Sequence, residues 1–418
     1  MNGRARDSEL APAPAPGLPL RSAIRLLATA LATACGDSAR PAPDVAVRDS
    51  GGVAIVDNPT AAATLELPWT VATEPSVVIG VVDGAPEYQL HRITGAARLS
   101  DGRIAVVNAG SGEIRFYDAA GSFLAAVGGE GEGPGEFRDM ALVDTAPGDS
   151  LLLYDPRLQR FTWVTAAPAI GRSFPSSDSA GGRLQVLPHG RLGSGRIVAS
   201  GRAIAEGTPS SGVRDPFRPL LVLDTGGTVR DTLGRYTHEP RHVWATERMV
   251  SIARVPYGSV TGFAVGAEAI HVAPADDWEI RTLDGDGRLA RLVRLHLQPR
   301  PVTATDVEAA IAEVLGRTSL SPADAREQHE MMEIPDRMPA HGRVLLDRDD
   351  HLWVEEYRAP GEAGPARWWV VDPEGRVLGV VALPGGLEVQ EIGGDYVLGV
   401  ALDELDTPRV VLYELDRE

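Results

Sequence analysis

Lysine is absent from the 418-residue sequence, so arginine supplies all 40 basic side chains. Without lysine the chain cannot form a Schiff base and cannot build the phosphate-binding lysine of a P-loop. The formal net charge is −18, whereas nucleic-acid binding draws most of its affinity from cations that neutralise phosphates. We therefore expect neither a nucleic-acid partner nor lysine-dependent chemistry.

Cysteine occurs once, at Cys35, which excludes an internal disulfide and a thiolate metal cluster. Arg21 and Arg25 precede an apolar run, residues 26–34, that ends in small residues directly before this cysteine. A basic region, a short apolar segment and small residues at a cleavage point are typical of a secretory signal, and the run is too short to span a bilayer. Residues 1–34 are therefore predicted to be a signal peptide, the alternative being a free cysteine in an N-terminal tail.

The four residues Ala32-Thr33-Ala34-Cys35 resemble the bacterial lipobox. That resemblance implies that Cys35 is acylated and becomes the first residue of an exported, membrane-anchored lipoprotein facing the periplasm or the cell exterior. Residues 35–52 follow as a polar tether rich in proline and alanine.

Aromatic residues make up only 5% of the chain, whereas glycine (46) and proline (32) recur between short apolar runs. This pattern favours many short strands joined by turns. The clearest unit has strands at 93–99, 103–107, 114–117 and 123–127, with turns between them. Four strands in about 35 residues form one blade of a β-propeller. Aromatic residues within such strands (Phe116, Trp163, Trp353, Trp368 and Trp369) are interpreted as packing between blades.

The unit recurs along the chain. Residues 151–155 and 160–163 match the second and third strands of the first unit at an offset of 47, and further pairs follow at 196–223, 269–283, 352–371 and 396–412. An Asp-x-x-Gly turn repeats between the third and fourth strands, because aspartate caps the turn and glycine accepts positive φ. Six units are predicted, with the propeller occupying residues 53–418. The last unit lacks a fourth strand, and residues 76–79 are predicted to supply it and to close the ring.

Residues 131–137, Gly-Glu-Gly-Pro-Gly-Glu-Phe, link one predicted blade to the next. Together with the strand order, this link resembles the linker of six-bladed NHL-repeat propellers. The resemblance implies an all-β fold, a six-bladed β-propeller of four-stranded antiparallel blades, and it implies little about activity.

One segment, about 303–333, does not belong to the repeat. Thr305 and Glu308 are expected to form a capping box, with an apolar stripe after them, and Ser321-Pro322 is expected to begin a second helix. This helical hairpin falls between the fourth and fifth units, so we expect it on one face of the propeller.

No catalytic motif stands out. Asp347-Arg348-Asp349-Asp350 and residues 284–287 have acids at calcium-like spacing, but each stands where the repeat requires a turn. Candidate binding residues in the channel or loops are His91, Arg92, Glu136, Arg138, His341 and Glu355.

The sequence favours an envelope-anchored propeller that binds a protein or small-molecule ligand, with no metal assigned. The alternative is a calcium-dependent hydrolase or lactonase whose carboxylates converge on the central channel.

Overall fold

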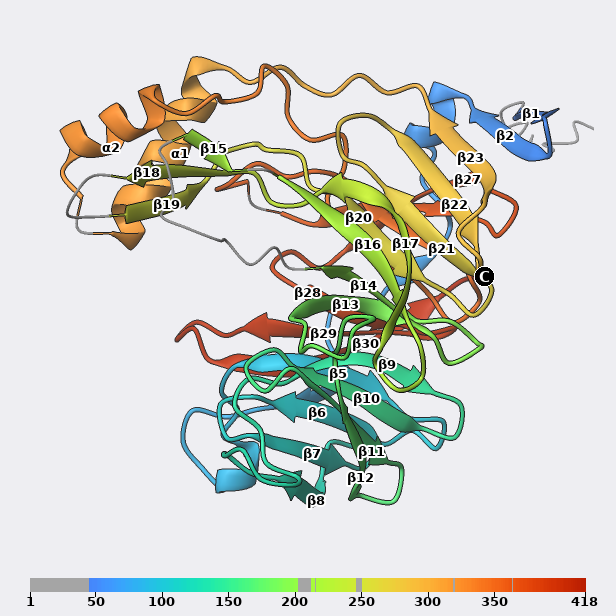
Figure 1. Ribbon diagram of the computed structural model, residues 1–418, viewed down its shortest axis with the longest axis vertical. Coiled ribbons are helices and arrows are strands. Elements are labelled where there is room, and N and C mark those ends of the chain that lie inside the picture. The colour runs from blue at the N-terminus through green and yellow to red at the C-terminus, as the bar shows by residue number, and fades with distance from the viewer. Residues whose placement is uncertain (1–44, 202–211, 215, 246–249, 319, 363) are drawn as a thin grey trace, which may run out of the picture. The chain divides into compact units, whose positions relative to one another are not determined.

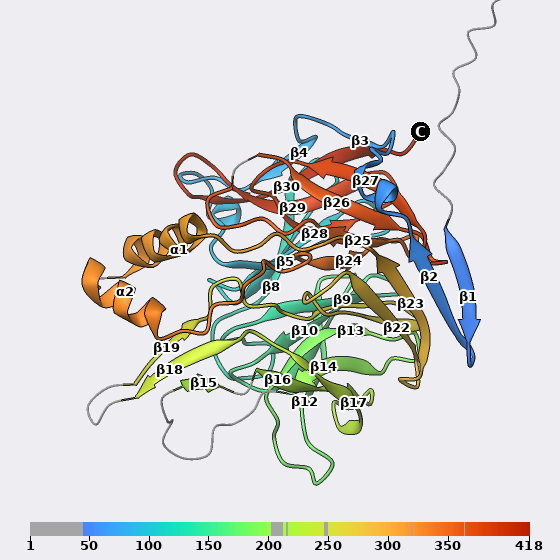
Figure 2. The same ribbon diagram turned by 90° about the horizontal axis from the view of Figure 1, so that it is seen from above.

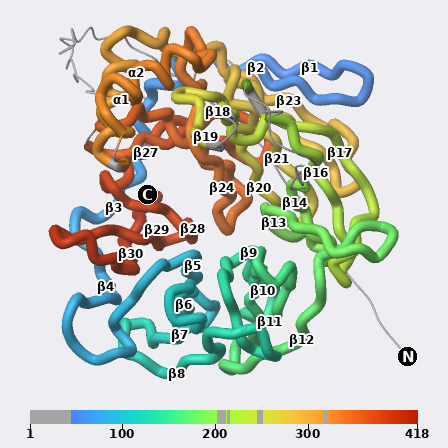
Figure 3. Tube along the Cα trace, turned by 60° about the vertical axis from the view of Figure 1, so that its left-hand side comes forward, coloured from blue at the N-terminus to red at the C-terminus, as the bar shows by residue number. Residues whose placement is uncertain are grey.

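Six antiparallel sheets, each a blade of four principal strands, follow one another along the chain and surround a common axis (Figures 1 and 3). The computed structural model describes residues 45–418 except 202–211, 215, 246–249, 319 and 363. Contacts between the first strands of successive blades line the axis. The predicted six-bladed propeller is confirmed.

Blades 1 to 3 occupy the first half of the propeller. Blade 1 contains β5 (Ile93–Arg98), β6 (Ile104–Asn108), β7 (Glu113–Tyr117) and β8 (Phe123–Gly128). Blade 2 contains β9 (Ala141–Ala146), β10 (Ser150–Asp155), β11 (Arg160–Thr165) and β12 (Ala169–Pro175). Blade 3 contains β13 (Val186–Arg191), β14 (Ile197–Gly201), β16 (Phe217–Leu223) and β17 (Val229–Thr237).

Blades 4 to 6 complete the ring. Blade 4 contains β20 (Gly262–Val265), β21 (Ala269–Ala273), β22 (Glu279–Asp284) and β23 (Leu289–Leu295). Blade 5 contains β24 (Val344–Leu346), β25 (Leu352–Glu355), β26 (Ala366–Val371) and β27 (Val377–Leu383). Blade 6 contains β28 (Glu388–Ile392), β29 (Tyr396–Leu402) and β30 (Pro408–Asp416), and its outer strand is β4 (Val77–Ile79).

The Asp-x-x-Gly turns have the predicted geometry. In the first of them the Asp118 carboxylate accepts hydrogen bonds from the backbone N–H groups of Ala120 and Ser122, and Gly121 has φ +85°. Glycine adopts this left-handed conformation without the steric cost that a Cβ would bring. The same arrangement recurs at 224–227, 284–287 and 372–375.

The core lies between blades, so a central strand is buried on both faces. On β10, Leu151 and Leu153 pack against blade 1, while Leu152 and Tyr154 pack against blade 3. Successive side chains of a strand point to opposite faces. This double burial explains why these strands are continuous apolar runs instead of alternating ones.

The chain closes the ring as predicted. β4 pairs antiparallel with β30, and β3 (Thr70–Val71) pairs with the end of the same strand. The short helices η1 (Thr60–Thr64) and η2 (Pro86–Tyr88) lie before and after these strands. Ring closure therefore joins a segment near residue 78 to the last strand of the chain.

Residues 46–50, which the sequence analysis assigns to the tether, form β1 (Ala46–Ser50) in a hairpin with β2 (Val53–Asn58). β2 pairs in parallel with β23, so this hairpin extends the outer edge of blade 4 (Figure 2). Ala46 lies opposite Asp57, and Asp57 lies opposite Arg294 near the end of β23.

Strands within a blade alternate in direction. The connection from the fourth strand of one blade to the first strand of the next therefore emerges on the same face as the connection between the second and third strands. We call this the crossing face. The predicted helical hairpin is inserted there, between β23 and β24, as α1 (Ala304–Arg317) and α2 (Pro322–Glu330).

The cap of α1 differs from the prediction. Thr303, not Thr305, is the N-cap residue, and Asp306 completes the capping box in place of Glu308. The shorter carboxylate of Asp306 reaches back to the backbone N–H of Thr303 at 2.8 Å. The prediction failed because it sought the glutamate of the usual pattern. Within the described residues, no helix has the length and apolar character needed to cross a membrane.

Candidate ligand-binding site

Three insertions interrupt the repeat on the crossing face. β15 (Gly212–Arg214) lies between β14 and β16 in the chain, β18 (Arg241–Ala245) and β19 (Val250–Arg254) precede β20, and the helices precede β24. The three strands form one small sheet, and the helices lie beside it in all three views (Figures 1, 2 and 3). The insertions therefore gather over one part of the propeller.

Tyr257, just after β19, joins the small sheet to the helices. Its hydroxyl donates a hydrogen bond to the carbonyl oxygen of Asp306 at 2.6 Å, and its ring packs with Ala310 of α1 and with Met338. The two segments that carry the hairpin are also joined, because the Met338 N–H donates to the carbonyl oxygen of Arg300 at 2.8 Å. These contacts fix the hairpin relative to blades 4 and 5.

We call the segments directly before and after the helical hairpin, which contain Arg300 and Met338, the carrier segments. A first cavity, of about 360 Å³, lies between the carrier segments and the loop that follows β25. Its apolar lining includes Leu297, Met338 and Trp369. Trp369 is held rigidly, because its indole N–H donates to the carbonyl oxygen of Ala63 at 3.2 Å and its ring stacks edge-on with Trp278. The sequence-based interpretation of Trp369 as a packing residue is confirmed, and the same ring forms a wall of this cavity.

The cation of the first cavity is already neutralised. Arg300 donates to both carboxylate oxygens of Asp306, at 2.9 and 3.1 Å, and lies 3.7 Å from Glu362. This bidentate pair holds the pKa of Asp306 well below its ordinary value, chiefly through the hydrogen bond from Arg300. The first cavity thus combines apolar side chains such as Leu297, Met338 and Trp369 with polar groups, of which the Arg300–Asp306 ion pair is satisfied.

A second cavity, of about 400 Å³, shares Pro339, Glu356 and Tyr357 with the first. On the blade 4 side the lining includes the small residues Gly258, Gly262 and Ala275, which leave the space open. On the blade 5 side it includes the charged residues Arg343, Glu355 and Arg358. Glu356 is paired with Arg367 at 2.9 Å. The two cavities thus adjoin at Tyr357 and its two neighbours in the shared wall.

Glu355 and Arg358 are only loosely paired in the second cavity. The closest approach of the Glu355 carboxylate to the Arg358 guanidinium is 4.0 Å, which is beyond hydrogen-bonding distance. Their side chains are 18% and 30% exposed. Among the described residues no carboxylate is ion-paired with Arg343, whose guanidinium donates to the Val389 carbonyl oxygen. This cavity therefore contains charges of both signs that keep hydrogen-bonding capacity.

Tyr357 stands between the cavities. Burial raises the pKa of its phenol to about 12, so the hydroxyl stays protonated at neutral pH. Within the described part of the chain this hydroxyl has no hydrogen-bond partner. A neutral phenol with an unused donor and acceptor suits recognition of a polar ligand group.

Two of the six candidate residues line the second cavity, His341 and Glu355. His341 is 1% exposed, and its ring nitrogens face the carbonyl oxygens of Gly342 and Pro274 at 3.0 and 3.2 Å. Burial lowers the pKa of its imidazole. His341 thus shapes the wall, whereas Glu355 offers a carboxylate to the space.

The other four candidates lie on the crossings that lead into blades 1 and 2. The His91 N–H donates to the side-chain oxygen of Asn108, and the Arg138 N–H donates to Asp155, which stands 47 residues after Asn108. Arg92 pairs with Asp139 at 2.6 Å, and Arg138 pairs with Glu132 at 2.7 Å. Here the candidates fasten the crossings between blades.

Glu136 has a similar role within its crossing. Its carboxylate accepts a hydrogen bond from the backbone N–H of Gly133 at 2.8 Å. The glutamate closes the Gly-Pro-Gly turn, and the repeat needs it there as a structural residue.

Tyr357, Arg358 and Arg300 were not among the residues predicted from the sequence. Their position could have been predicted, because Tyr357 and Arg358 directly follow the predicted strand that ends at Glu355. Residues after a second strand emerge on the crossing face, where the helical insertion also lies. Together these two facts would have predicted that Tyr357 and Arg358 lie on the same face as the helical insertion.

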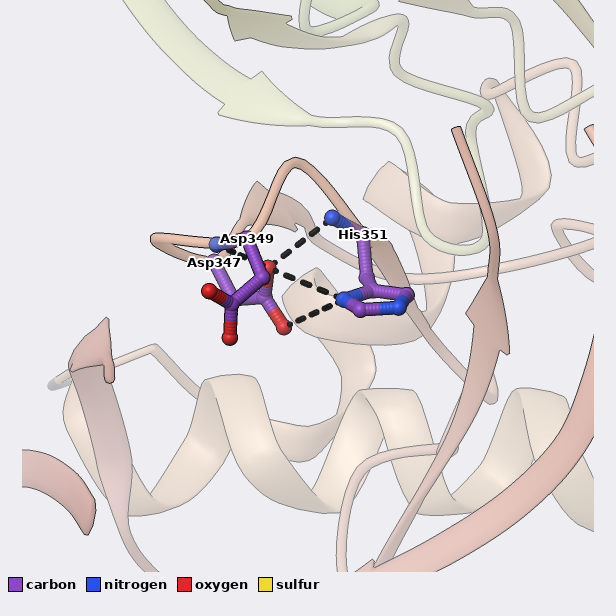
Figure 4. A group of neighbouring side chains, drawn as sticks. All are labelled: Asp347, Asp349 and His351. Atoms are coloured by element: carbon purple, nitrogen blue, oxygen red, sulfur yellow. Dashed lines mark hydrogen bonds and ion pairs between the residues drawn. The ribbon is translucent and has the colours of Figure 1, made fainter. Parts of the chain in front are cut away.

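One group of side chains has metal-like spacing in the described residues, Asp347, Asp349 and His351 in the β24–β25 turn (Figure 4). The Asp347 carboxylate, however, accepts hydrogen bonds from the N–H groups of Asp349 and His351, the rings of His351 and Trp353, and Arg417. Arg417 supplies the cation at 2.9 Å. The group is a turn and an ion-pair network, as the sequence-based interpretation holds.

A histidine and a serine also meet within blade 3. His189 and Ser200 approach to 2.7 Å, and His189 stacks on Phe263 at 4.3 Å. Burial lowers the pKa of His189 to about 3, so the ring is neutral. Ser200 is 3% exposed, which closes it to a substrate, and we assign the pair a packing role.

Acids on the innermost strands do not converge. In the described residues these strands contain Asp144, Glu388 and Glu391. Asp144 is paired with Arg191 at 2.8 Å, and Glu391 is paired with Arg348 at 2.5 Å. Two of the three carboxylates are thus ion-paired with arginine.

No protein-family model matches the chain, and no curated protein matches it at a significant level. Solved structures do resemble it. A Bacteroides fragilis protein with the provisional name of exported protein aligns at 9% identity over 87% of this chain and 99% of its own, with a TM-score of 0.46. A member of the DUF4221 family from Bacteroides vulgatus aligns at 9% identity over 84% and 99%, with a TM-score of 0.45.

Virginiamycin B lyase from Staphylococcus aureus also aligns, at 9% identity over 83% of this chain and 99% of its own, with a TM-score of 0.36. These likenesses lie at the level of the propeller architecture. A shared fold does not fix function, which depends on the residues of this chain's own site.

Proposed function

We propose that this protein is an exported propeller, anchored through Cys35, that binds a small ligand in the two adjoining cavities of blades 4 and 5. The observation that carries the proposal is the shared wall of Pro339, Glu356 and Tyr357, which joins a cavity whose arginine is neutralised to a cavity whose charges are loosely paired. Ligand sites are typically concave, mainly apolar and supplied with a few polar groups. Rigid propeller strands position the loops that line this one.

The place of the site supports a binding role. The lining comes from the same face that carries all three insertions, so departures from the repeat coincide with the cavities. The chain also enters the propeller there, because Ala46 of β1 lies level with the end of β23. Cys35 lies in the segment outside the described residues.

A calcium-dependent hydrolase has less support. Such a site needs several oxygen ligands directed at one point. Asp144 and Glu391 are instead ion-paired with arginine on the innermost strands. We therefore assign binding without turnover.

The test uses N-phenyl-1-naphthylamine, an uncharged probe that fluoresces in apolar surroundings. Wild-type protein should bind it saturably. Ala359→Trp places a large ring in the first cavity, whose lining includes Ala359, and should weaken binding at least tenfold. The control is Ala120→Trp, at an exposed turn of blade 1. Equal binding by both variants, or the absence of saturable binding by the wild type, would refute the proposal.

A further inference from the structure

The two cavities differ in how their charges are satisfied. In the first, Arg300 donates two hydrogen bonds to Asp306 and is neutralised. In the second, Glu355 and Arg358 face each other at 4.0 Å, too far for a hydrogen bond. The Glu355 carboxylate accepts a long hydrogen bond from the Arg343 backbone N–H at 3.4 Å, and Arg358 donates to the Gly364 carbonyl oxygen at 3.2 Å, so each group keeps further hydrogen-bonding capacity. An adjacent anion and cation of this kind suit a ligand that presents both complementary charges side by side.

We infer that the second cavity binds the ammonium and carboxylate groups of an α-amino acid whose apolar side chain extends into the first cavity. This inference rests on the proposed function. Glu355 accepts from the ammonium group, Arg358 donates to the carboxylate, and the side chain lies against Trp369. An α-amino acid fits because its two charges are carried on and next to a single carbon atom, and so reach two neighbouring partners at once.

The shared wall supports this arrangement. Tyr357 lines both cavities, and its phenol is protonated at neutral pH, as an ordinary tyrosine is; burial raises its pKa further. It can therefore donate to the ligand carboxylate. Pro339 and Trp369 offer apolar surface immediately beyond. A free amino acid with a large apolar side chain satisfies each of these groups, whereas a simple fatty acid leaves Glu355 without a partner.

The experiment measures binding of three related molecules by isothermal titration calorimetry. L-Phenylalanine carries both charges, phenethylamine lacks the carboxylate, and 3-phenylpropionate lacks the ammonium group. We expect L-phenylalanine to bind at least tenfold more tightly than either analogue, because each lost charge leaves a partly buried partner unsatisfied. Equal affinity for all three would overturn the inference.

Two variants assign the charges. Glu355→Gln should weaken the binding of L-phenylalanine about tenfold and leave the binding of 3-phenylpropionate unchanged. Arg358→Gln should weaken the binding of L-phenylalanine and leave the binding of phenethylamine unchanged. Arg157→Gln removes a charge from an exposed pair on blade 2 and serves as the control. Thermal melting of each variant checks the fold. Loss of binding of all three molecules by either variant, with the melt unchanged, would contradict the assigned pairing.

The outcome separates the two proposals. If N-phenyl-1-naphthylamine binds and is blocked by Ala359→Trp, but L-phenylalanine neither binds nor displaces it, the amino-acid inference fails and the ligand site stands. If neither molecule binds, the proposed function fails as well.

Discussion

Val78 and Val411 lie directly opposite each other in antiparallel register, although 333 residues separate them in the chain. This pairing makes β4 the outer strand of blade 6. The ring therefore depends on a three-residue strand, of which Val77 and Ile79 face the core and Val78 is 47% exposed.

Ile79→Ala should destabilise the protein by about 2–5 kcal/mol, because Ile79 is fully buried in the cluster between blades 6 and 1. Val78→Ala, at the exposed neighbour, should cost less than about 1 kcal/mol. Urea unfolding at constant m-value measures both. Equal effects would show that β4 contributes little to closure.

A chain that begins at residue 83 should fail to give a soluble, cooperative fold, because blade 6 would lose β3 and β4. The unpaired edge of β30 would then be exposed to association. Circular dichroism and size-exclusion chromatography test this. A soluble monomer with an unchanged melt would contradict the closure model.

The network around Asp347 should make stability depend on pH. The hydrogen bond that the His351 ring donates to Asp347 raises the pKa of His351 above 6.5, so this contribution is complete below pH 6.5 and is lost as the pH rises through the raised pKa. Burial opposes ionisation of Asp347, but hydrogen bonds from His351 and Trp353 lower its pKa below 3.8. The ionised Asp347 carboxylate therefore stabilises the folded protein above pH 3.8, and this stabilisation is lost as the pH falls through the lowered pKa. The contribution of this network should be greatest between about pH 4 and 6.5, whereas burial of neutral His189 and His341 opposes folding as the pH falls below 6.5.

His351→Gln tests this directly. The difference in unfolding free energy between wild type and variant should shrink as the pH rises from 6 to 8.5. Arg417 also contacts this carboxylate and lies 4.7 Å over the Trp69 ring, so Arg417→Gln is a second variant that should lower stability throughout. A pH-independent difference for His351→Gln would contradict the assignment.

Replacing residues 303–333 with a short glycine linker should leave the propeller folded. The carrier segments are already joined by backbone hydrogen bonds, from Met338 to Arg300 and from Val302 to Asp336. Binding of N-phenyl-1-naphthylamine should weaken, since the hairpin holds Arg300 and Met338 at the first cavity. Global unfolding of the shortened chain would assign the hairpin a structural role instead.

The lipid anchor is tested by labelling cells with a radioactive fatty acid. Wild type should take up label and Cys35→Ala should not, since Cys35 is the only cysteine in the sequence. Equal labelling of the two would rule out acylation at this residue.

Much of the fold follows from local patterns in the sequence. Apolar runs such as 151–154 specify strands buried on both faces, and Asp118 with Gly121 specifies the turn that repeats in later blades. Even the closure by residues 77–79 was predictable, because the last unit lacked one strand. The N-terminal hairpin was not, since the β1 side chains are exposed and carry no burial pattern.

The site was predictable only in part. Glu355 and His341 were candidates and do line the second cavity, yet His91, Arg92, Glu136 and Arg138 serve the crossings. Sequence alone cannot separate these roles, because both groups follow strand ends and consist of polar residues. What distinguishes them is their contacts in the folded chain: Glu355 and His341 line a cavity, whereas His91, Arg92, Glu136 and Arg138 make hydrogen bonds and ion pairs within the crossings.

Hydrogen–deuterium exchange with and without N-phenyl-1-naphthylamine tests the central claim most directly. If the ligand site is the pair of cavities around Tyr357, protection should rise in segments 297–300, 338–343 and 355–359. Protection confined to 91–92 and 136–139, or to none of these segments, would contradict it.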